Sequence, residues 1–439
     1  MINKIINYLS NKKVAILGFG REGKSTLNFI LKYLPNQEIT IIDQNNNLER
    51  MSNPKIHYLL GDNYLDYLND FDLVIKTPGI SLVDKKYQCE ITSEFALFLE
   101  NSETLTIGVT GTKGKSTTSS LIYKIIKDQK DNTFLVGNIG IPLFDYLEEF
   151  RKDSVIVAEM SAHQLYDLKK SPNISIVTNL FEEHLDYFHT LDNYYNSKLN
   201  IFRYQNEDDY AIYLEDNLEL NKRVKELDLN SHIIGLSSHN IVDHKIVLDN
   251  ENIFDLTEDK KIFGYYNNLN IMMALQVAKI LDLDLKQAGK SIKEFEGLDH
   301  RMKLVGVVNK RCFYDDTLAT IPAASINSIK SIPNVKTIIL GGMDRNINYD
   351  DYIEYLRSSE LKTIICQPDT GKYIYDKLKD LHNKNVLYIE NLKEAVKTAY
   401  EMTNKEESIL LSPAAPSYNV YKDYADKSAH YLDYIKELD

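Results

Sequence analysis

Short apolar runs alternate along the chain with longer stretches in which apolar residues recur at helical spacing. Runs of this kind, bounded by glycine, proline or polar residues, are typical of parallel strands that are buried on both faces. The pattern therefore predicts an α/β fold built on parallel sheets. The predicted strands lie at residues 14–17, 38–43, 71–76, 106–110, 155–160, 174–180, 312–316, 337–342, 363–367, 386–390 and 408–412.

The middle of the chain departs from this alternation. Around residues 240–265 the pattern becomes short strands and turns, and a helix is predicted from Asn267 to about Leu281. Residues 295–305, FEGLDHRMKLV, have the polar composition of a linker. A chain of 439 residues is long enough for two to four domains, and these changes in pattern predict three.

A glycine loop follows the strand predicted at 106–110, where residues 106–118 read TIGVTGTKGKSTT. Glycines let the backbone approach phosphate oxygens, and N–H groups at a helix start point at the anion. Lys115 adds a point charge, and Ser116 or Thr117 can place a hydroxyl on Mg²⁺. Val109 stands where the common P-loop has glycine. A surface turn is the alternative, but the order of strand, loop and helix favours a nucleoside triphosphate site.

A second glycine motif opens the chain, where VAILGFGREGKS at 14–25 has full G-x-G-x-x-G spacing. Asp43 ends the next predicted strand, about where an acidic residue binds a ribose hydroxyl. The motif reports only that a diphosphate-sized anion can lie at a helix start. NAD(P), another nucleotide diphosphate and a purely structural turn all stay open. Thr77, Pro78 and Gly79 form another loop at the same sheet edge, where such sheets bind ligands.

The composition narrows the class of protein. A formal net charge of −13 argues against sequence-independent binding to nucleic acid or to an anionic membrane. No run approaches the roughly 20 apolar residues of a membrane span, and the N-terminal residues lack the apolar core of a signal peptide. The three cysteines, Cys89, Cys312 and Cys366, are far apart and odd in number. We therefore expect a cytoplasmic protein without a disulfide framework.

Read together, the motifs resemble the Mur ligase family over essentially the whole chain. They occur in one order: VTGTKGKSTT, VAEMSAHQL, TNLFEEHLDYF, YYNSKLNIF, GYYNNLN, DHRMK, YDDTLAT, LGGMD and SPAAPSYNVYKDY. The resemblance implies a Rossmann-like UDP-sugar-binding domain at 1–98. It implies a central P-loop ATPase domain at 99–302 and a Rossmann-like amino-acid-binding domain at 303–439. The diphosphate at the first glycine motif is then that of UDP.

The resemblance also implies a reaction. It is the ATP-dependent addition of D-glutamate to UDP-N-acetylmuramoyl-L-alanine through an acyl phosphate, in peptidoglycan precursor synthesis. A sibling ligase that uses L-glutamate or another amino acid is the alternative. An NAD-dependent oxidoreductase would leave the second loop unexplained, and a GTPase would need an N-K-x-D motif, which we do not find. We expect a monomer with small-molecule substrates and no nucleic-acid or membrane partner.

Residue by residue, the family's motifs imply five groups of site residues. Lys115, His184 and Lys198 are expected to be catalytic. Two Mg²⁺ ions are expected on Ser116, Glu159, His184 and Lys198, the last carbamylated by CO₂. ATP is expected to contact Gly111, Thr112, Lys113, Gly114, Lys115, Ser116, Thr117, Asn270, Arg301 and Asp316. The UDP-sugar is expected to contact Gly18, Phe19, Gly20, Arg21, Asp43, Thr77, Pro78, Gly79, Asn138 and Gln164. The amino acid is expected to contact Thr320, Arg345, Ser417, Tyr418 and Tyr424.

The chain departs from the family's pattern at several of these motifs. Tyr266 stands where the family usually has histidine, and Leu318 and Ile321 replace lysine and asparagine. Lys427-Ser428 replaces the usual Arg-Gly pair. Arg345 offers a planar fork for a glutamate carboxylate, although its turn differs in length and composition from the family's. These departures leave the choice between D- and L-glutamate open.

Overall fold

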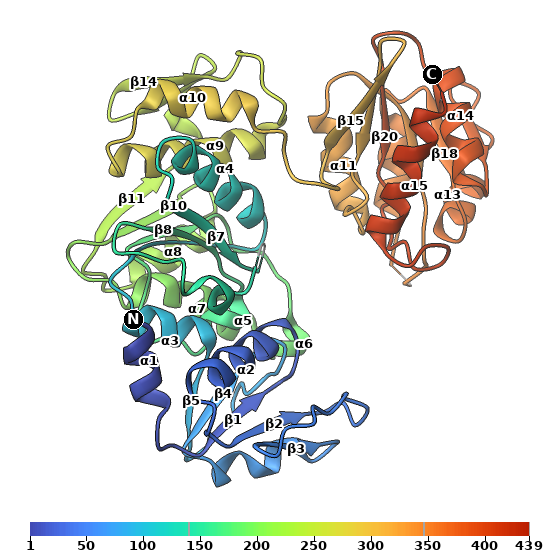
Figure 1. Cartoon of the computed structure of the whole chain (residues 1–439). Coiled ribbons are helices and arrows are strands. Elements are labelled where there is room, and N and C mark those ends of the chain that lie inside the picture. Colours follow the sequence, from blue (N-terminus) through green and yellow to red (C-terminus); the bar gives the residue numbers. More distant parts are fainter. Residues whose placement is uncertain (139–140, 346, 439) are drawn as a thin grey trace. The chain divides into compact units, whose positions relative to one another are not determined.

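The computed structural model describes residues 1–138, 141–345 and 347–438 (Figure 1). The chain forms two compact units. The first unit comprises residues 1–257 and 269–292, and the second comprises residues 258–268 and 293–439. The predicted α/β class with parallel sheets is confirmed, whereas the three domain boundaries stay a prediction. In the described part of the chain, no helix is both long and apolar enough to cross a membrane.

The first unit begins with a five-stranded parallel sheet of order β3-β2-β1-β4-β5. Every residue of β1 is buried, as expected for a strand covered on both faces. The chain switches direction across the sheet at β1, so a crevice for a ligand is expected beyond its carboxyl end. The elements are α1 (Ile2–Leu9), β1 (Val14–Leu17), α2 (Arg21–Tyr33), β2 (Ile39–Asp43), β3 (Ile56–Leu60), η1 (Tyr64–Asp70), β4 (Leu73–Lys76), β5 (Glu90–Thr92) and α3 (Glu94–Asn101).

A six-stranded parallel sheet of order β11-β10-β9-β6-β8-β7 follows in the same unit. One hydrophobic cluster includes Ile16 and Phe29 of the first sheet region and Ile156 and Phe188 of this one, so the two share a core. The elements are β6 (Leu105–Thr110), α4 (Lys115–Lys127), β7 (Thr133–Gly137), η2 (Leu143–Tyr146), β8 (Val155–Glu159), α5 (Ala162–Leu165), β9 (Ile174–Val177), α6 (Leu185–Phe188), α7 (Leu191–Arg203), β10 (Tyr210–Leu214), α8 (Leu218–Glu226) and β11 (His232–Leu236).

The short strands expected around 240–265 form a three-stranded antiparallel sheet that ends at Asp255. The helix predicted from Asn267 is present but begins at Tyr265. It is apolar on most sides and ten of its residues are buried, which is why its period is weak in the sequence. The elements are η3 (Ser238–Asn240), β12 (Ile241–Val242), β13 (Lys245–Leu248), β14 (Glu251–Asp255), α9 (Tyr265–Ile280) and α10 (Leu285–Glu294).

The second unit holds a six-stranded sheet of order β15-β16-β20-β17-β18-β19, parallel except for β15. The expected linker at 295–305 ends inside β15, an edge strand whose residues are mostly half-exposed. The elements are β15 (Lys303–Val308), β16 (Arg311–Asp315), α11 (Pro322–Ser331), β17 (Val335–Leu340), α12 (Asp350–Ser358), β18 (Thr363–Cys366), α13 (Thr370–Leu378), β19 (Asn385–Tyr388), α14 (Leu392–Met402), β20 (Ser408–Leu411) and α15 (Tyr424–Lys436).

Candidate active site

The glycine loop between β6 and α4 is held by the end of the neighbouring strand β9. Gly111 has φ +143°, and a Cβ there would lie 1.9 Å from Thr178 Oγ1. The Thr178 hydroxyl donates to the Lys113 carbonyl at 2.6 Å, and the Lys113 amide donates to Asn179 Oδ1 at 2.8 Å. The loop is therefore fixed by its own sheet, with α4 beginning at Lys115 directly after it.

Two lysines converge on the carbonyl of Gly111. Lys115 Nζ donates to Gly111 O and to Thr112 O at 3.0 Å, and Lys198 Nζ, from α7, donates to Gly111 O at 2.8 Å. Lys198 is only 2% exposed. Burial, with the Lys115 charge beside it, holds the pKa of Lys198 well below its usual range. Desolvation thus favours the neutral amine of Lys198, the form that can act as a nucleophile.

Glu159 ends β8 beside this loop, in register with Val109 of β6. Its Oε1 accepts from Asn138 Nδ2 at 2.8 Å. Glu159 Oε2 and Thr110 Oγ1 are buried and have no hydrogen-bond partner among the described residues. A buried carboxylate oxygen without a partner is costly, and a hard cation such as Mg²⁺ would satisfy it. The residues at this edge therefore fit a magnesium ion.

His184 lies at the start of α6, where it adopts a left-handed backbone with φ +57°. Its ring centroid is 4.9 Å from that of His163. Desolvation lowers the pKa of His184, which favours the neutral imidazole that can bind a metal. Within the described residues, no group of three or more His, Cys, Asp or Glu side chains could hold a metal by itself. Mg²⁺ keeps several waters and takes few protein ligands, so it does not require such a group.

The other predicted nucleotide residues of the first unit lie around the same loop. Asn270 of α9 is 6% exposed and accepts from Thr118 Oγ1 at 3.1 Å. A Cβ at Gly114 would lie 2.8 Å from Asn270 Oδ1, so the asparagine packs against the loop that precedes α4. Ser116 and Thr117 are in the first turn of α4. The structure thus brings Asn270 to the phosphate loop although about 150 residues separate them in sequence.

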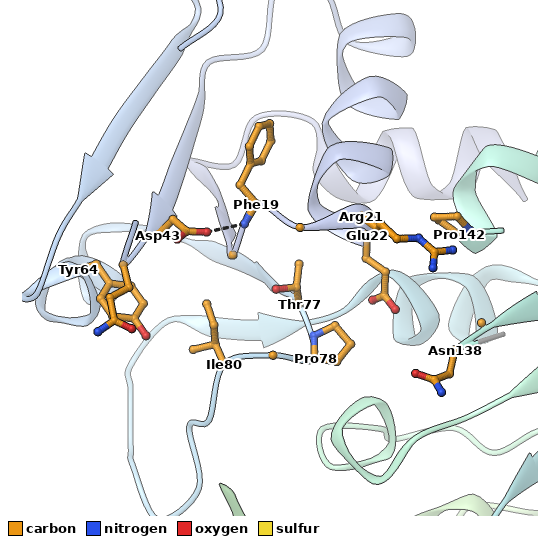
Figure 2. Close-up of a pocket in the computed structure, with 15 residues that line it drawn as sticks. Phe19, Arg21, Glu22, Asp43, Tyr64, Thr77, Pro78, Ile80, Asn138 and Pro142 are labelled. Atoms are coloured by element: carbon orange, nitrogen blue, oxygen red, sulfur yellow. Dashed lines mark hydrogen bonds between the residues drawn. The ribbon is translucent and has the colours of Figure 1, made fainter. Parts of the chain in front are cut away.

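A cleft of about 450 Å³ opens at the carboxyl edge of the first sheet (Figure 2). Nine of the ten residues predicted to bind the UDP-sugar line it: Gly18, Phe19, Gly20, Arg21, Asp43, Thr77, Pro78, Gly79 and Asn138. Asn138 comes from the second sheet, after β7, and so connects this cleft to Glu159. One side-chain hydrogen bond therefore joins the cleft lining to Glu159, at the strand end beside the phosphate loop.

Gln164 is the predicted residue that does not line this cleft. Its Oε1 accepts from the Ser161 amide at 2.9 Å in the capping box of α5, and its Nε2 donates to Glu22 Oε1 at 2.6 Å. Asp43 lines the cleft, and its carboxylate already accepts from the amides of Phe19 and Asn45, both at 2.8 Å. These two side chains hold the walls of the cleft in place.

Sequence reasoning missed six residues of the cleft lining. These residues were given no role, although Glu22 lies inside the glycine motif at 14–25: Glu22, Gln44, Tyr64, Ile80, Gly137 and Pro142. Glu22 and Gln44 directly follow predicted residues, so their neighbours are the available signal. Tyr64 and Pro142 come from η1 and the start of η2, and only the folded chain brings them to the glycine loop.

The remaining predicted residues lie in the second unit, most of them beyond the carboxyl ends of its strands. Asp316 follows β16 and accepts from Ser412 Oγ at 2.8 Å and from the Met302 amide at 3.3 Å. Burial raises the pKa of Asp316 to about 7. Because its carboxylate is bonded inside the unit, a contact with a ribose would have to replace one of these bonds. Arg301 is exposed in the turn before β15.

The loops after β16, β17 and β20 and the first residue of α15 carry the predicted amino-acid contacts. Arg345 is exposed after β17, and Tyr418 and Tyr424 are exposed after β20. Ser417 Oγ is buried and has no hydrogen-bond partner among the described residues, and Thr317 Oγ1, near Thr320, is in the same state. Sequence reasoning gave no role to Lys427, which is buried and donates to Gly341 O at 3.0 Å. This edge offers hydroxyl groups and a cation to a small polar ligand.

Two family models match the chain. The Mur ligase middle domain matches residues 109–278, and the Mur ligase, glutamate ligase domain matches residues 300–415. The chain is 30% identical over 468 residues to the UDP-N-acetylmuramoylalanine--D-glutamate ligase of Acetivibrio thermocellus, covering 100% of this chain and 99% of that protein. The protein of the same name from Clostridioides difficile is 30% identical, with 98% of this chain and 99% of the relative covered.

Solved structures resemble the chain over nearly its whole length. The UDP-N-acetylmuramate-alanine ligase of Thermotoga maritima has a TM-score of 0.60 at 19% identity, covering 98% of this chain and 100% of that one. A MurF ligase from the same organism, solved with ADP, has a TM-score of 0.60 at 17% identity, covering 97% and 94%. At this identity the likeness concerns the fold alone.

Proposed function

Because this chain belongs to the Mur ligase family, we propose that it adds D-glutamate to UDP-N-acetylmuramoyl-L-alanine with ATP. The ligation is a step of peptidoglycan precursor synthesis. The observation that carries the proposal is the junction at Asn138, which lines the cleft of the first glycine motif and donates to Glu159 beside the phosphate loop. A UDP-sugar in the cleft can thus present its free carboxylate where a γ-phosphate would lie.

The reaction explains why the site has cations and metal ligands rather than a Ser-His-Asp arrangement. ATP supplies the γ-phosphoryl group, whose transfer to the carboxylate oxygen gives an acyl phosphate and releases ADP. The amine of glutamate then attacks the acyl carbon, loses a proton, and expels inorganic phosphate as the amide forms. Phosphoryl transfer depends mainly on positioning and charge neutralisation. Lys115 supplies charge at the loop, and α4 directs its first amides to the same place.

Ser116, Glu159 and His184 would hold Mg²⁺, which neutralises charge on the phosphates. We propose that Lys198 completes this set as a carbamate. Its buried, neutral amine can form a C–N bond with CO₂ and release a proton, which converts the neutral amine into an anionic carbamate. The orphaned Glu159 Oε2 and Thr110 Oγ1 support a cation at this edge.

The incoming amino acid belongs at the carboxyl edge of the second unit's sheet. Arg345, which is exposed after β17, would pair with a carboxylate of the amino acid, and the buried hydroxyl of Ser417 would offer a hydrogen bond. Thr320, Tyr418 and Tyr424 are further contacts in this proposal, and Arg301 and Asp316 belong to the nucleotide. We also propose that the protein works as a monomer in the cytoplasm, which fits its three free cysteines.

Phosphate release tests the proposal directly. The purified protein is given Mg²⁺, ATP and UDP-N-acetylmuramoyl-L-alanine, with D-glutamate, L-glutamate or another amino acid in parallel reactions. We expect phosphate and a new amide product only with D-glutamate. Product with another amino acid instead would make the chain a sibling ligase. No product with any amino acid would refute the ligase assignment.

A further inference from the structure

A buried lysine outside the predicted site connects the cleft wall to α6 and to Asp167. Lys76, at the end of β4, is only 3% exposed and directly precedes Thr77 of the cleft wall. Its Nζ lies 3.1 Å from Asp167 Oδ2 and 3.4 Å from both Ile80 O and Tyr187 OH. A buried ammonium group is costly unless it is paired, so these partners fix where it lies.

Tyr187, in α6, is hydrogen-bonded to the same segment of the cleft wall. Its hydroxyl donates to Ile80 O at 2.7 Å, and its own carbonyl accepts from Ser81 Oγ at 2.8 Å. Thr77, Pro78, Gly79 and Ile80 all line the cleft, and Figure 2 shows Thr77, Pro78 and Ile80 at its wall. The segment that forms this wall is therefore bonded to α6 at both the side chain and the backbone of one tyrosine.

Tyr187 is also connected to His184, through the backbone and through neighbouring rings. The Tyr187 amide donates to the His184 carbonyl at 3.1 Å. Its ring lies 4.2 Å, centroid to centroid, from the ring of His163, which in turn is 4.9 Å from the ring of His184. His184 and Tyr187 are thus linked through one turn of α6 and through the ring of His163, which contacts both of their rings.

We propose that Lys76 and Tyr187 form a strut that sets the distance between the UDP-sugar cleft and the metal-binding edge of the ATP site. The inference rests on the proposed function. The strut contacts the walls of both sites, so Lys76 and Tyr187 are positioning residues. Each ligand binds on one side of the strut. A loosened strut therefore leaves each ligand's own affinity nearly unchanged and misplaces the carboxylate relative to the γ-phosphate.

Tyr187→Phe tests the strut with a small change, since it removes the hydroxyl and keeps the ring. We expect kcat to fall about tenfold, because small misplacements of reacting groups are costly. We expect the dissociation constants of the UDP-sugar alone and of Mg²⁺ with a non-hydrolysable ATP analogue alone to change less than about twofold. The double variant Lys76→Met, Asp167→Asn removes both partners of the ion pair, leaves no unpaired buried charge, and should give the same pattern.

The chain supplies a matched control between the same two segments. His189 Nδ1 lies 3.0 Å from Asp84 Oδ2, and both side chains are exposed. Exposed pairs contribute little, so His189→Gln should keep kcat within about twofold of wild type. Thermal unfolding of all variants separates a general loss of stability from a loss of position.

A binding measurement keeps the test independent of the reaction. Calorimetry gives the dissociation constant of the UDP-sugar with and without the bound ATP analogue, and their ratio is the coupling between the sites. The wild type should show a ratio clearly different from one, and Tyr187→Phe should bring it close to one. An unchanged ratio and kcat in both strut variants, or a wild type without coupling, would overturn the strut. A wild type that couples the ligands but makes no product with any amino acid would refute the ligase assignment alone.

Discussion

The two glycine loops of the first unit have one backbone construction and two different surroundings. Gly18 follows β1 and Gly111 follows β6, and both have positive φ. A Cβ at either would strike a threonine hydroxyl on the neighbouring strand, Thr77 at 2.1 Å and Thr178 at 1.9 Å. The threonine amides donate to Leu17 O and Thr110 O, both at 2.9 Å. Both loops therefore present a helix start to an anion in the same way.

The side chains around the loops make the difference. The Gly111 carbonyl accepts from Lys115 and Lys198, and an orphaned carboxylate oxygen of Glu159 lies at the same edge. The first loop instead opens on a cleft that contains Glu22 and Asp43. The Lys115 charge beside a candidate metal site suits the transfer of a phosphoryl group, whereas an open cleft suits the binding of a diphosphate that does not react. A glycine motif alone thus specifies an anion site and not its chemistry.

The sharpest test of this difference is Lys198→Ala. If phosphoryl transfer takes place at the Gly111 loop, kcat should fall roughly 10³-fold. Losses of this size follow when one group that stabilises the charge of a transition state is removed. Steady-state phosphate release measures it. Excess bicarbonate or a short carboxylate should restore part of the activity. A Lys198→Ala enzyme with wild-type kcat would contradict the proposed difference between the two loops. Lys127→Ala, on α4, is a control that should stay active.

Glu159→Gln should give the next largest effect. The substitution keeps the size of the side chain and the possibility of a bond with Asn138, but it removes the charge that a cation needs. We expect kcat/KM to fall roughly 10²-fold and the Mg²⁺ concentration for half-maximal rate to rise. A titration of activity against Mg²⁺ measures both. An unchanged Mg²⁺ requirement would remove Glu159 from the metal site.

Paired glycine substitutions test the shared backbone construction. Gly18→Ala and Gly111→Ala should each lower the free energy of unfolding by about 2 kcal/mol or more, because alanine is strained at positive φ and meets a threonine. Chemical denaturation measures this. Gly18→Ala should raise the KM for the UDP-sugar and Gly111→Ala the KM for ATP, each about tenfold. Gly20→Ala, where a Cβ meets no atom within 4 Å, should keep full stability. Equal effects of one substitution on both KM values would contradict two separate anion sites.

The smallest effect concerns Glu22 in the first loop. Burial raises the pKa of this carboxyl. An acid loses its proton as the pH rises, so the charge that repels a diphosphate grows with pH. Glu22→Gln should therefore lower the KM for the UDP-sugar about twofold at high pH, and progressively less as the pH falls and the wild-type carboxyl takes up its proton. A pH series of KM values for the two enzymes checks this, and an identical pH dependence would place Glu22 away from the diphosphate.

The motifs predicted which residues line the cleft better than they predicted which side chains hold that lining in place. Gly18, Asp43 and Thr77 stand in loops that follow strands, and residues of such loops meet at one sheet edge whatever the rest of the fold does. Gln164 was predicted to reach the substrate, but its amide is engaged with Ser161 and Glu22. Its role at the substrate stays a prediction. The contact with Glu22 spans 142 positions, and no local pattern contains it.

Some strands were missed or misplaced whatever their burial. The start of β15, which reads KLVGVV, was assigned to the linker because the residues before it are mostly polar. Neither β10 nor β11 was predicted: β11 is mostly half-exposed or exposed, whereas four of the five residues of β10 are buried. Burial by itself therefore does not decide which strands could be predicted from the sequence.

The sequence by itself determined the alternation of strands and helices, the two anion-binding loops, and the ordered motifs that assign the chain to its family. Strand and turn preferences are local, so they are legible in a single sequence. Only the tertiary structure decided that Thr178 lies under Gly111, that Asn138 bonds Glu159, and that Lys76 meets Asp167 and Tyr187. Those contacts join residues far apart in the chain, and they form because burial compels each polar group to find a partner that the fold brings near.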